Sequence, residues 1–364
     1  MRKYNFLSYN FKLILFTIAL AVIGILAVGS AEEGLQNRQI MGAIAGIIIM
    51  LILSVIDYQY LIKLAPLYYI ANAGLLVMVL AFGESGGGAQ RWIRIAGIQF
   101  QPSELCKLAV IICFSAFIKR YYEDFNSFRI IGLSVLFFVI PAVLVYSQPD
   151  LSTTIVLALI FITIMFVSEI SWKVIVGVLA VTIPILLILL YLIMQPEQNL
   201  VSEYQKGRIM SFFNKESTAN DQGYQQTYSV MAIGSGQLSG KGYKNNEIYS
   251  VKNADFIAEQ QTDFILAVIG EEFGFIGTCS VIILILLISI ECFLTAFRAP
   301  DIAGRIIGAG VGAWIGFQGF INIGVVTYIL PNTGLPLPFV SYGLTSLVCS
   351  FIAIGFVLNV GFQS

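Results

Sequence analysis

Histidine is missing from this chain of 364 residues, and charged residues make up only 11% of it. The commonest general base and metal ligand of proteins is therefore absent, so any proton transfer falls to aspartate or glutamate. The five cysteines show no CxxC spacing, which indicates neither a disulfide framework nor a metal site. These absences leave carboxylates as the candidate reactive groups.

What remains is strongly apolar, with 58% hydrophobic residues and a mean hydropathy of +0.86. A chain this long and apolar cannot bury its side chains in one soluble core, so the composition predicts a polytopic membrane protein. Several uncharged runs approach the ~20 residues that a helix needs to cross hydrocarbon. Seven such runs cover residues 13–31, 39–56, 64–83, 130–149, 151–168, 174–196 and 273–290.

Three further spans are expected in the rest of the chain. Residues 306–364 carry no charge, and the prolines of PNTGLPLP (331–338) divide this run into two helices. The tenth span contains the uncharged residues 108–118 and reaches full length only if Glu104 and Lys107 belong to its first turns. Their i, i+3 spacing permits an ion pair, which lowers the cost of both charges. The sequence thus predicts an all-α polytopic protein with ten transmembrane helices.

The distribution of lysine and arginine orients these spans. With the N-terminus inside, ten basic residues fall in short cytoplasmic loops and three fall outside, which favours two cytoplasmic termini. The long loop of about residues 196–262, between helices 7 and 8, is then extracytoplasmic. The first apolar run is followed by Glu32 and Glu33 rather than by a small-residue cleavage site, so it is interpreted as a span. We expect a single membrane domain over residues 1–364.

Two expected spans begin with similar motifs on the outer side, FQPSELCK (100–107) and SQPDLSTT (147–154). Proline and acidic or hydroxyl residues suit the first turn of a helix, where they complement unpaired N–H groups and the helix dipole. Capping is therefore the favoured interpretation of Asp150. For Glu104 and Lys107 a functional role is an equal alternative, because an ion pair inside a span marks a candidate site.

Residues 83–99, GESGGGAQRWIRIAGIQ, are too short and too polar to cross a membrane. They are interpreted as a membrane-surface anchor, in which the apolar side chains lie in the interface and Arg91 and Arg94 face water. The alternative is that the two arginines line a site for an anionic lipid headgroup.

The long loop carries two further motifs. YQKGRIMSFFN (204–214) sets Lys206 and Arg208 beside an aromatic pair. GSGQLSGKGYKNN (234–246) is rich in glycine, but Gly242 stands where a phosphate-binding loop has serine or threonine. No nucleotide site is expected in this loop.

The segment QTDFILAVIGEEFGFIG (261–277) carries three carboxylates and no basic residue. Lone carboxylates near hydrocarbon pair, face water or take part in chemistry. One helix over residues 263–297 would be about 52 Å long, against ~30 Å of hydrocarbon, so a bend is expected at Gly270 and Gly274. Asp263 would then lie outside the eighth span.

Asp263 therefore shares the outer side with the other candidate charges, and this convergence favours a functional role for it over simple helix capping. Those other charges are Glu104, Lys107 and Asp150. Glu271 and Glu272 lie deeper and are expected to be mainly structural, satisfying backbone or polar groups at the bend.

Taken together, these motifs resemble the SEDS family (shape, elongation, division and sporulation), whose members include RodA, FtsW and SpoVE. The matching stretches are RWIRIAGIQFQPSELCKLA, QPDLSTT, the segment around Arg208, GYQQTYSVMAIGSGQLSGKGY, TDFILAVIGEEFGFIG and FINIGVVTYILPNTGLPLPFVSYGLTS. The chain departs from the family pattern at Gln261, where histidine is common, and at Ser152 and Leu344, where glycine is usual. None of these departures removes a carboxylate.

The resemblance implies a bacterial cytoplasmic-membrane enzyme that polymerises peptidoglycan glycan strands from lipid II at the outer face. It assigns the catalytic aspartate of the TDF motif to Asp263. It also assigns the QPSExxK motif, with Gln101, Ser103, Glu104 and Lys107, to the central cavity.

The chemistry fits that assignment, because no nucleotide supply exists outside the membrane and a lipid-linked sugar pyrophosphate arrives already activated. An inverting displacement that releases undecaprenyl pyrophosphate needs one base, Asp263, and positive charge on the departing group. The sequence specifies no cofactor, although a divalent cation, Mg²⁺ or Mn²⁺, is an option at the pyrophosphate. The side chains that could hold its phosphates are Lys107, Arg91, Arg94, Lys206 and Arg208.

Two other functional classes compete with a polymerase. A transporter that flips lipid II would also need ten spans and membrane-embedded charges, but it would not need the external TDF carboxylate. A scaffold that only recruits a partner polymerase would leave the charged outer residues without a role. Within the family, the short tails favour RodA-like elongation, while FtsW-like division and SpoVE-like sporulation stay open.

The resemblance also implies partners. The only large external element is one loop of about 67 residues, so no transpeptidase domain is expected. Crosslinking would then come from a class B penicillin-binding protein, alongside other membrane proteins of the elongation machinery and no nucleic acid. The small residues of AGRIIGAGVGAWIG (303–316) could receive the partner's single span. Packing within the chain is the favoured alternative for the same glycines.

Overall fold

The computed structural model describes residues 9–86, 89–95, 98–177, 223–244, 257 and 260–363, together with residues 180, 184, 191 and 212. The helices of the first half are α1 (Phe11–Ala31), α2 (Glu33–Val55), α3 (Tyr58–Lys63), α4 (Ala65–Phe82), α5 (Pro102–Arg120), α6 (Phe128–Tyr146) and α7 (Leu151–Val167). Those of the second half are α10 (Tyr224–Ser235), α11 (Ile265–Arg298), α12 (Ile302–Val326) and α13 (Leu344–Phe362).

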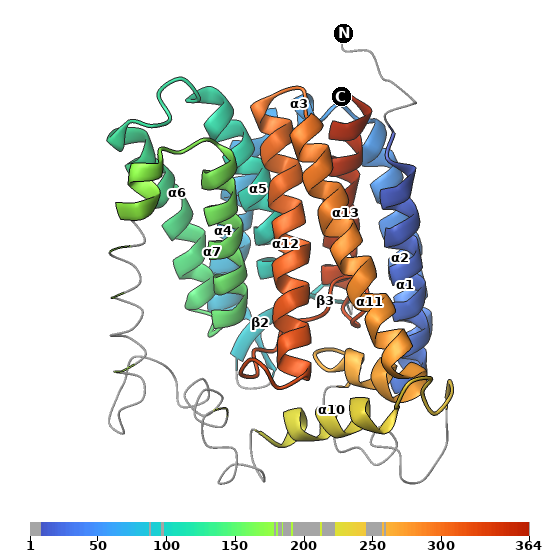
Figure 1. Ribbon diagram of the computed structural model, residues 1–364. Helices are drawn as coiled ribbons and strands as arrows, with labels where there is room; N and C mark the ends of the chain where they lie inside the picture. The colour runs from blue at the N-terminus through green and yellow to red at the C-terminus, as the bar shows by residue number, and fades with distance from the viewer. Residues whose placement is uncertain are drawn as a thin grey trace.

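The long helices stand side by side as one bundle, and α10 lies across one end of it (Figure 1). Helix α1 starts and α13 finishes at the opposite end, where α3 also lies and contacts α13. Seven of the described helices are long and apolar enough to cross a membrane: α1, α2, α4, α6, α11, α12 and α13. The chain is therefore a multi-pass membrane protein. The predicted span over residues 174–196 lies largely outside the described residues.

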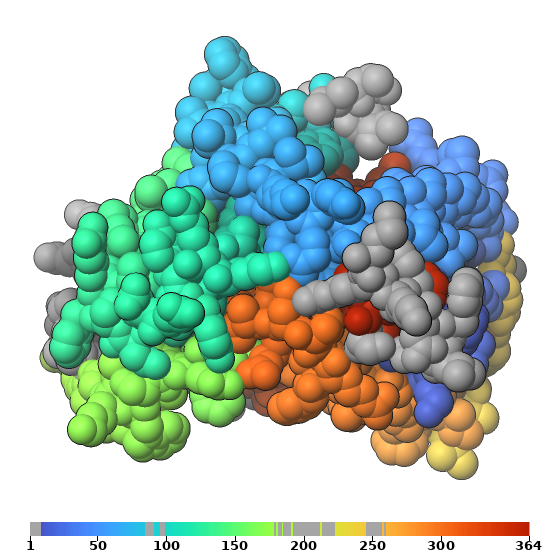
Figure 2. Space-filling view, turned by 90° about the horizontal axis from the view of Figure 1, so that it is seen from above, coloured from blue at the N-terminus to red at the C-terminus, as the bar shows by residue number. Residues whose placement is uncertain are grey.

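Helices α12 and α13 form the centre of the bundle, and most of their side chains are buried. Helix α12 packs on α11, α7 and α5, while α13 packs mainly on α2. By contrast, only 22% of the residues in the apolar stretches of α4 and α6 are buried, as expected for helices that face lipid. At the end opposite to α10, the α5–α6 segment, the end of α7 and the start of α12 meet (Figure 2).

The glycines of residues 303–316 pack inside the chain. A Cβ added to Gly308 would come within 2.9 Å of Ala296, and one added to Gly310 within 3.0 Å of Ile111. A Cβ added to Gly316 would come within 2.8 Å of the Ser289 hydroxyl. The stripe therefore lets α12 approach α11 and α5 closely, which confirms the internal-packing interpretation and removes these glycines as a docking face for a partner.

Residues 84–100 depart from the all-helical fold that the sequence predicts. They form a three-stranded antiparallel sheet in the order β1 (Glu84–Gly86), β2 (Ala89–Ile95) and β3 (Ile98–Phe100). The polar, glycine-rich sequence cannot enter hydrocarbon, and pairing in strands satisfies its backbone groups instead. The sheet lies at the α10 end of the bundle (Figure 1).

Helix α6 contains a proline whose effect is compensated by a neighbouring helix. Pro141 has no N–H, so the carbonyl of Phe137, four residues earlier, has no donor within α6. The hydroxyl of Tyr69 on α4 donates a 2.8 Å hydrogen bond to that carbonyl. The contact ties α4 to α6 where both helices face lipid.

Helix α11 bends at Gly274, one of the two glycines at which a bend is expected. Gly274 has φ 65° and ψ −158°, so the helix backbone is broken there. The N–H groups of Phe275 and Ile276 lose their helical acceptors, which are the carbonyls of Glu271 and Glu272. All four groups are instead paired with the segment of residues 236–244 that follows α10.

The pairing follows a regular pattern. Phe275 N–H donates to the Gln237 carbonyl at 2.8 Å, and Ile276 N–H donates to the Leu238 carbonyl at 3.2 Å. In return, the N–H groups of Lys241 and Gly242 donate to the carbonyls of Glu271 and Glu272 at 2.9 and 3.0 Å. We call residues 236–244 the splice segment, because they complete the hydrogen bonding of a broken helix.

Candidate active site

The first turn of α5 carries a buried ion pair. Pro102 begins the helix, and the Glu104 carboxylate lies 2.7 Å from the Lys107 ammonium, with both side chains at most 1% exposed. The ion pair expected from the i, i+3 spacing is thus present. The second carboxylate oxygen of Glu104 has no hydrogen-bond partner in the part of the chain that the structure describes.

Two residues of α12 complete the surroundings of Lys107. The ammonium donates to Oε1 of Gln318 at 2.7 Å and lies 4.8 Å from the centre of the Trp314 ring. Trp314 Nε1 donates to the same Gln318 oxygen at 2.7 Å. A carboxylate, an amide oxygen and an aromatic face therefore share one buried positive charge, which offsets its desolvation.

Asp150 connects the two motifs that begin spans on the α10 side. One of its oxygens accepts from the Thr153 N–H at 3.1 Å and caps α7, as the capping interpretation expects. The other accepts from the Ser103 hydroxyl at 3.4 Å, and Gln101 Nε2 donates to that hydroxyl at 3.0 Å. The Asp150 carboxylate thus both caps α7 and contacts α5.

Strand β2 brings its first arginine to this cluster. Arg91 lies 4.0 Å from the Asp150 carboxylate, and it also donates to the carbonyls of Gln148 and Pro149. Its guanidinium is therefore engaged with the turn between α6 and α7. Arg94, on the same strand, is exposed. Lys206 and Arg208 lie outside the described residues.

Asp263 lies in the turn that precedes α11, and three consecutive backbone carbonyls of this turn accept hydrogen bonds from other segments. Its carbonyl accepts from Asn322 Nδ2 at 2.8 Å. The carbonyls of the two preceding residues, Gln261 and Thr262, accept from the Tyr342 N–H at 2.9 Å and from the Ser341 hydroxyl at 2.5 Å. The candidate catalytic residue therefore sits on a segment fixed to α12 and to the residues just before α13.

Two amide side chains that the sequence motifs do not single out belong to this site. Gln318 donates to the Pro336 carbonyl at 2.8 Å, and Asn322 donates to the Leu335 carbonyl at 2.7 Å. Both side chains are fully buried. The available signal was their i, i+4 spacing within the uncharged residues 306–364, which places two polar groups on one face of a buried helix.

Glu271 and Glu272 hold the splice segment at the bend. The Glu271 carboxylate lies 2.7 Å from the Lys241 ammonium. Glu272 accepts from the Ser30 hydroxyl of α1 and from the Lys244 N–H. The expectation that both carboxylates satisfy backbone and polar groups at the bend is thus confirmed.

Lys244 extends this arrangement to the start of α2. Its ammonium lies 2.7 Å from the Glu33 carboxylate, and this hydrogen bond raises the pKa of Lys244. The splice segment is therefore joined by side chains to α1 and α2 as well as to α11.

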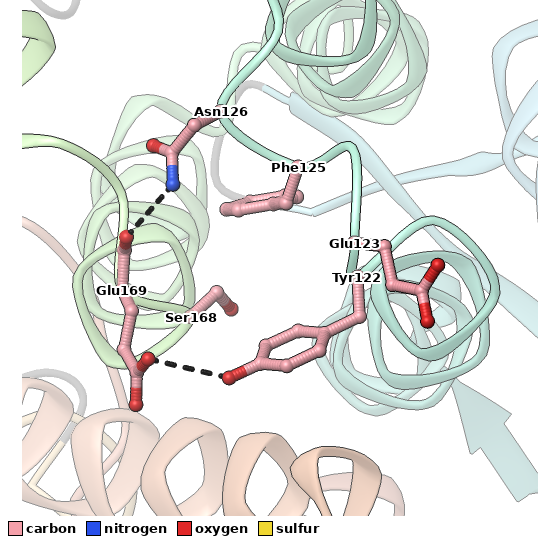
Figure 3. Close-up of a pocket in the computed structure, with 6 residues that line it drawn as sticks. All are labelled: Tyr122, Glu123, Phe125, Asn126, Ser168 and Glu169. Atoms are coloured by element: carbon pink, nitrogen blue, oxygen red, sulfur yellow. Dashed lines mark hydrogen bonds between the residues drawn. The ribbon is translucent and has the colours of Figure 1, made fainter.

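The described residues offer no group of three or more cysteine, aspartate or glutamate side chains that could hold a metal ion. A polar cavity of about 280 Å³ lies where the end of α7 meets the α5–α6 connection, at the end of the bundle away from α10. Its lining residues are Tyr122, Glu123, Phe125, Asn126, Ser168 and Glu169 (Figure 3). Asn126 and Tyr122 donate to Glu169, and none of the expected site residues lines it.

The family model described as cell cycle protein, for FtsW, RodA and SpoVE, matches residues 4–364. The chain belongs to this family. It is 34% identical over 351 residues to the peptidoglycan glycosyltransferase MrdB of Escherichia coli K12, with 96% of this chain and 92% of that protein covered. It is 33% identical over 374 residues to a Haemophilus ducreyi protein named probable peptidoglycan glycosyltransferase FtsW, with 98% and 90% covered.

Two solved structures share the fold of this chain. The crystal structure of Thermus thermophilus rod shape determining protein RodA matches with a TM-score of 0.70 and 26% identity over 98% of both chains. A chain from a peptidoglycan synthase complex, described as coordinating polymerization and crosslinking, matches with a TM-score of 0.78 and 26% identity over 97% of both chains.

Proposed function

We propose that this chain is a peptidoglycan glycosyltransferase. It transfers the disaccharide of lipid II onto a growing glycan strand at the outer face of the bacterial cytoplasmic membrane and releases undecaprenyl pyrophosphate. The observation that carries this proposal is the family match over residues 4–364, with relatives named peptidoglycan glycosyltransferase. The multi-pass bundle suits a lipid-linked substrate that arrives within the membrane. Residues 1–364 act as one membrane domain.

Asp263 is the general base in this proposal. The acceptor hydroxyl passes its proton to the Asp263 carboxylate while its oxygen bonds to the anomeric carbon and the bond to the pyrophosphate breaks with inversion. The absence of histidine and the fixed backbone at Asp263 support this assignment, because a base must be held within hydrogen-bond reach of the proton.

Glu104 and Lys107 shape the central cavity that the family resemblance implies, and they do not transfer the proton. Lys107 already contacts Glu104, Gln318 and Trp314, so its charge is compensated within the protein. Ser103, Gln101 and Asp150 extend the same polar region toward β2.

The departing pyrophosphate needs positive charge at the same end of the bundle. Arg94 is the exposed arginine of β2 and is assigned to the phosphates, with Lys206 and Arg208 as further candidates in the loop. Arg91 acts by holding the α6–α7 turn and the Asp150 carboxylate.

Purified protein in liposomes that contain lipid II separates the competing functions. A polymerase produces glycan strands whose length is read on gels. A flippase moves the headgroup across the bilayer without making strands. A scaffold does neither, so the absence of both products would overturn the proposal.

We further propose an elongation role with a class B penicillin-binding protein as partner and other elongation proteins nearby. The support is the match to MrdB, to RodA and to a chain of a synthase complex that coordinates polymerization and crosslinking. Depletion in the source bacterium, combined with co-purification, tests the role. Round, swollen cells support elongation, and filaments of normal width would assign division instead and leave the chemistry unchanged.

A further inference from the structure

We infer that Gln318 and Asn322 are positioning residues that set the placement of Asp263 relative to the Lys107 ion pair. The inference rests on the proposed function of Asp263. Both side chains act through hydrogen bonds to backbone carbonyls. Gln318 also accepts a hydrogen bond from Lys107.

Gln318 joins the ion pair to the proline-rich segment of residues 331–338. Its Oε1 accepts from Lys107 and from Trp314, each at 2.7 Å, and its Nε2 donates to the Pro336 carbonyl at 2.8 Å. The side chain is 0% exposed, so these bonds form where water cannot replace them. Lys107 is thereby fixed to one carbonyl of this segment.

Asn322 makes the equivalent connection one turn further along α12. Its Nδ2 donates to the Asp263 carbonyl at 2.8 Å and to the Leu335 carbonyl at 2.7 Å. Both amide hydrogens are therefore used on two segments that are distant in sequence. Asn322 thereby links the backbone of Asp263 to Leu335, the residue that precedes Pro336.

The two connections form a rigid frame. Gln318 and Asn322 are four residues apart, so their anchor points rise by about 6 Å along the α12 axis. Their acceptors, Leu335 and Pro336, are consecutive residues, and proline fixes φ within the segment. One turn of α12 and the proline-containing segment thus restrict how far Lys107 and Asp263 can move relative to each other.

Burying both amides is expensive unless they have a specific role. Asn322 is 0% exposed, and its Oδ1 has no hydrogen-bond partner in the described part of the chain. An apolar side chain would avoid that penalty but could not donate to two carbonyls. The need to position Asp263 for the reaction explains why two polar side chains are buried here, since a displacement of about 1 Å in a reacting group can lower a rate about 100-fold.

The test uses Asn322→Asp, which keeps the shape of the side chain and replaces the amide, the donor to both carbonyls, with a carboxyl group. Polymerisation of lipid II by purified protein gives kcat and KM, and hydrogen–deuterium exchange gives the protection of residues 260–264. We expect kcat to fall about 10- to 100-fold with little change in KM, and deuterium uptake in that peptide to rise. Asn322→Ser, which retains one donor, should be intermediate and decides the question if Asn322→Asp does not insert.

Asn359→Asp is the matched control. Asn359 is also 0% exposed and donates to a backbone carbonyl, that of Ser54, but it lies near the other end of α13. It should leave both kcat and the exchange of residues 260–264 unchanged. Equal losses in the two variants, normal kcat in Asn322→Asp, or lost activity without increased exchange would each overturn the inference.

Asp263→Ala is measured in the same assays to keep this inference separate from the proposed function. If Asp263→Ala polymerises normally, the assignment of the base fails whatever Asn322 does. If Asp263→Ala is inactive and Asn322→Asp is normal, only the positioning role fails.

Discussion

Lys241 contacts Glu271 twice, through its backbone N–H to the Glu271 carbonyl at 2.9 Å and through its ammonium to the carboxylate at 2.7 Å. The same residue pair thus supplies a missing helix hydrogen bond and neutralises a buried charge. The splice segment is therefore part of α11 in its hydrogen bonding, and the turn carrying Asp263 lies directly before that helix.

Gly240→Ala tests whether a docked splice segment is required. Gly240 has φ +81°, and an added Cβ would lie 2.1 Å from the Glu272 carbonyl oxygen, so the segment must move away from the bend. We expect faster proteolysis of the splice segment and at least a 10-fold loss of polymerisation, because misplacement of the nearby base is costly.

Gly242→Ala is the matched control for this prediction. Gly242 also has a positive φ, of +100°, but an added Cβ would meet nothing within 4 Å. Backbone strain of about 1–2 kcal/mol is therefore common to both variants, while the clash is specific to Gly240. Equal effects of the two substitutions would show that close approach of the segment to α11 is unimportant.

Tyr69→Phe is expected to destabilise the protein by about 1–3 kcal/mol, because it leaves the Phe137 carbonyl without a donor in an apolar environment. Thermal unfolding of the purified protein measures the change. In a Pro141→Ala background, the new N–H can donate to the same carbonyl, so the Tyr69 substitution should cost less. The same loss in both backgrounds would refute the proposed compensation.

Glu104 and Lys107 should behave as a coupled pair. Glu104→Gln or Lys107→Met alone leaves one buried charge uncompensated and should destabilise by about 3–5 kcal/mol. The double substitution should be milder, because no lone charge remains. Unfolding midpoints of all four proteins give the coupling energy, and a double variant as unstable as the sum of the single variants would contradict the pairing.

Asp301 gives a pH dependence at the end of the bundle opposite to α10. Burial acts to raise its pKa, but hydrogen bonds from Gly304, Tyr58, Gln59 and Lys119 outweigh it and hold the pKa below the usual 3.8. A depressed pKa stabilises the fold at pH values above about 4 and loses its effect as pH falls through the folded-state pKa. Asp301→Asn should therefore melt below wild type at pH 7, and the difference should shrink below pH 4. A difference that is constant with pH would contradict this account.

The sequence predicts those features that depend on local chemistry. The lengths of uncharged runs predict the long helices, and i, i+3 spacing predicts the pair of Glu104 with Lys107. The excess length of residues 263–297 predicts a bend at Gly270 and Gly274, and the structure bends at Gly274. Capping by Asp150 follows from its position before an apolar run. Each of these features needs only a few neighbouring residues to be recognised.

The remaining features depend on backbone N–H and carbonyl groups, whose partners cannot be identified from the residue types. The splice segment pairs with α11 through four main-chain hydrogen bonds, and Gln318 and Asn322 donate to carbonyls of segments far along the chain. Residues 84–100 were not expected to form strands, because they have no alternating apolar pattern of useful length. Such partners become visible only when the helices are placed in space.

The central claim is that Asp263 accepts the proton of the acceptor hydroxyl during strand synthesis. Its most direct test is the rate of lipid II polymerisation by purified Asp263→Asn and Asp263→Ala proteins that insert and melt like wild type. An amide or a methyl group cannot take the proton, so the account predicts a loss of about 10²- to 10⁴-fold in rate for both. Glycan strands formed at a near-normal rate by well-folded Asp263→Ala protein would contradict it.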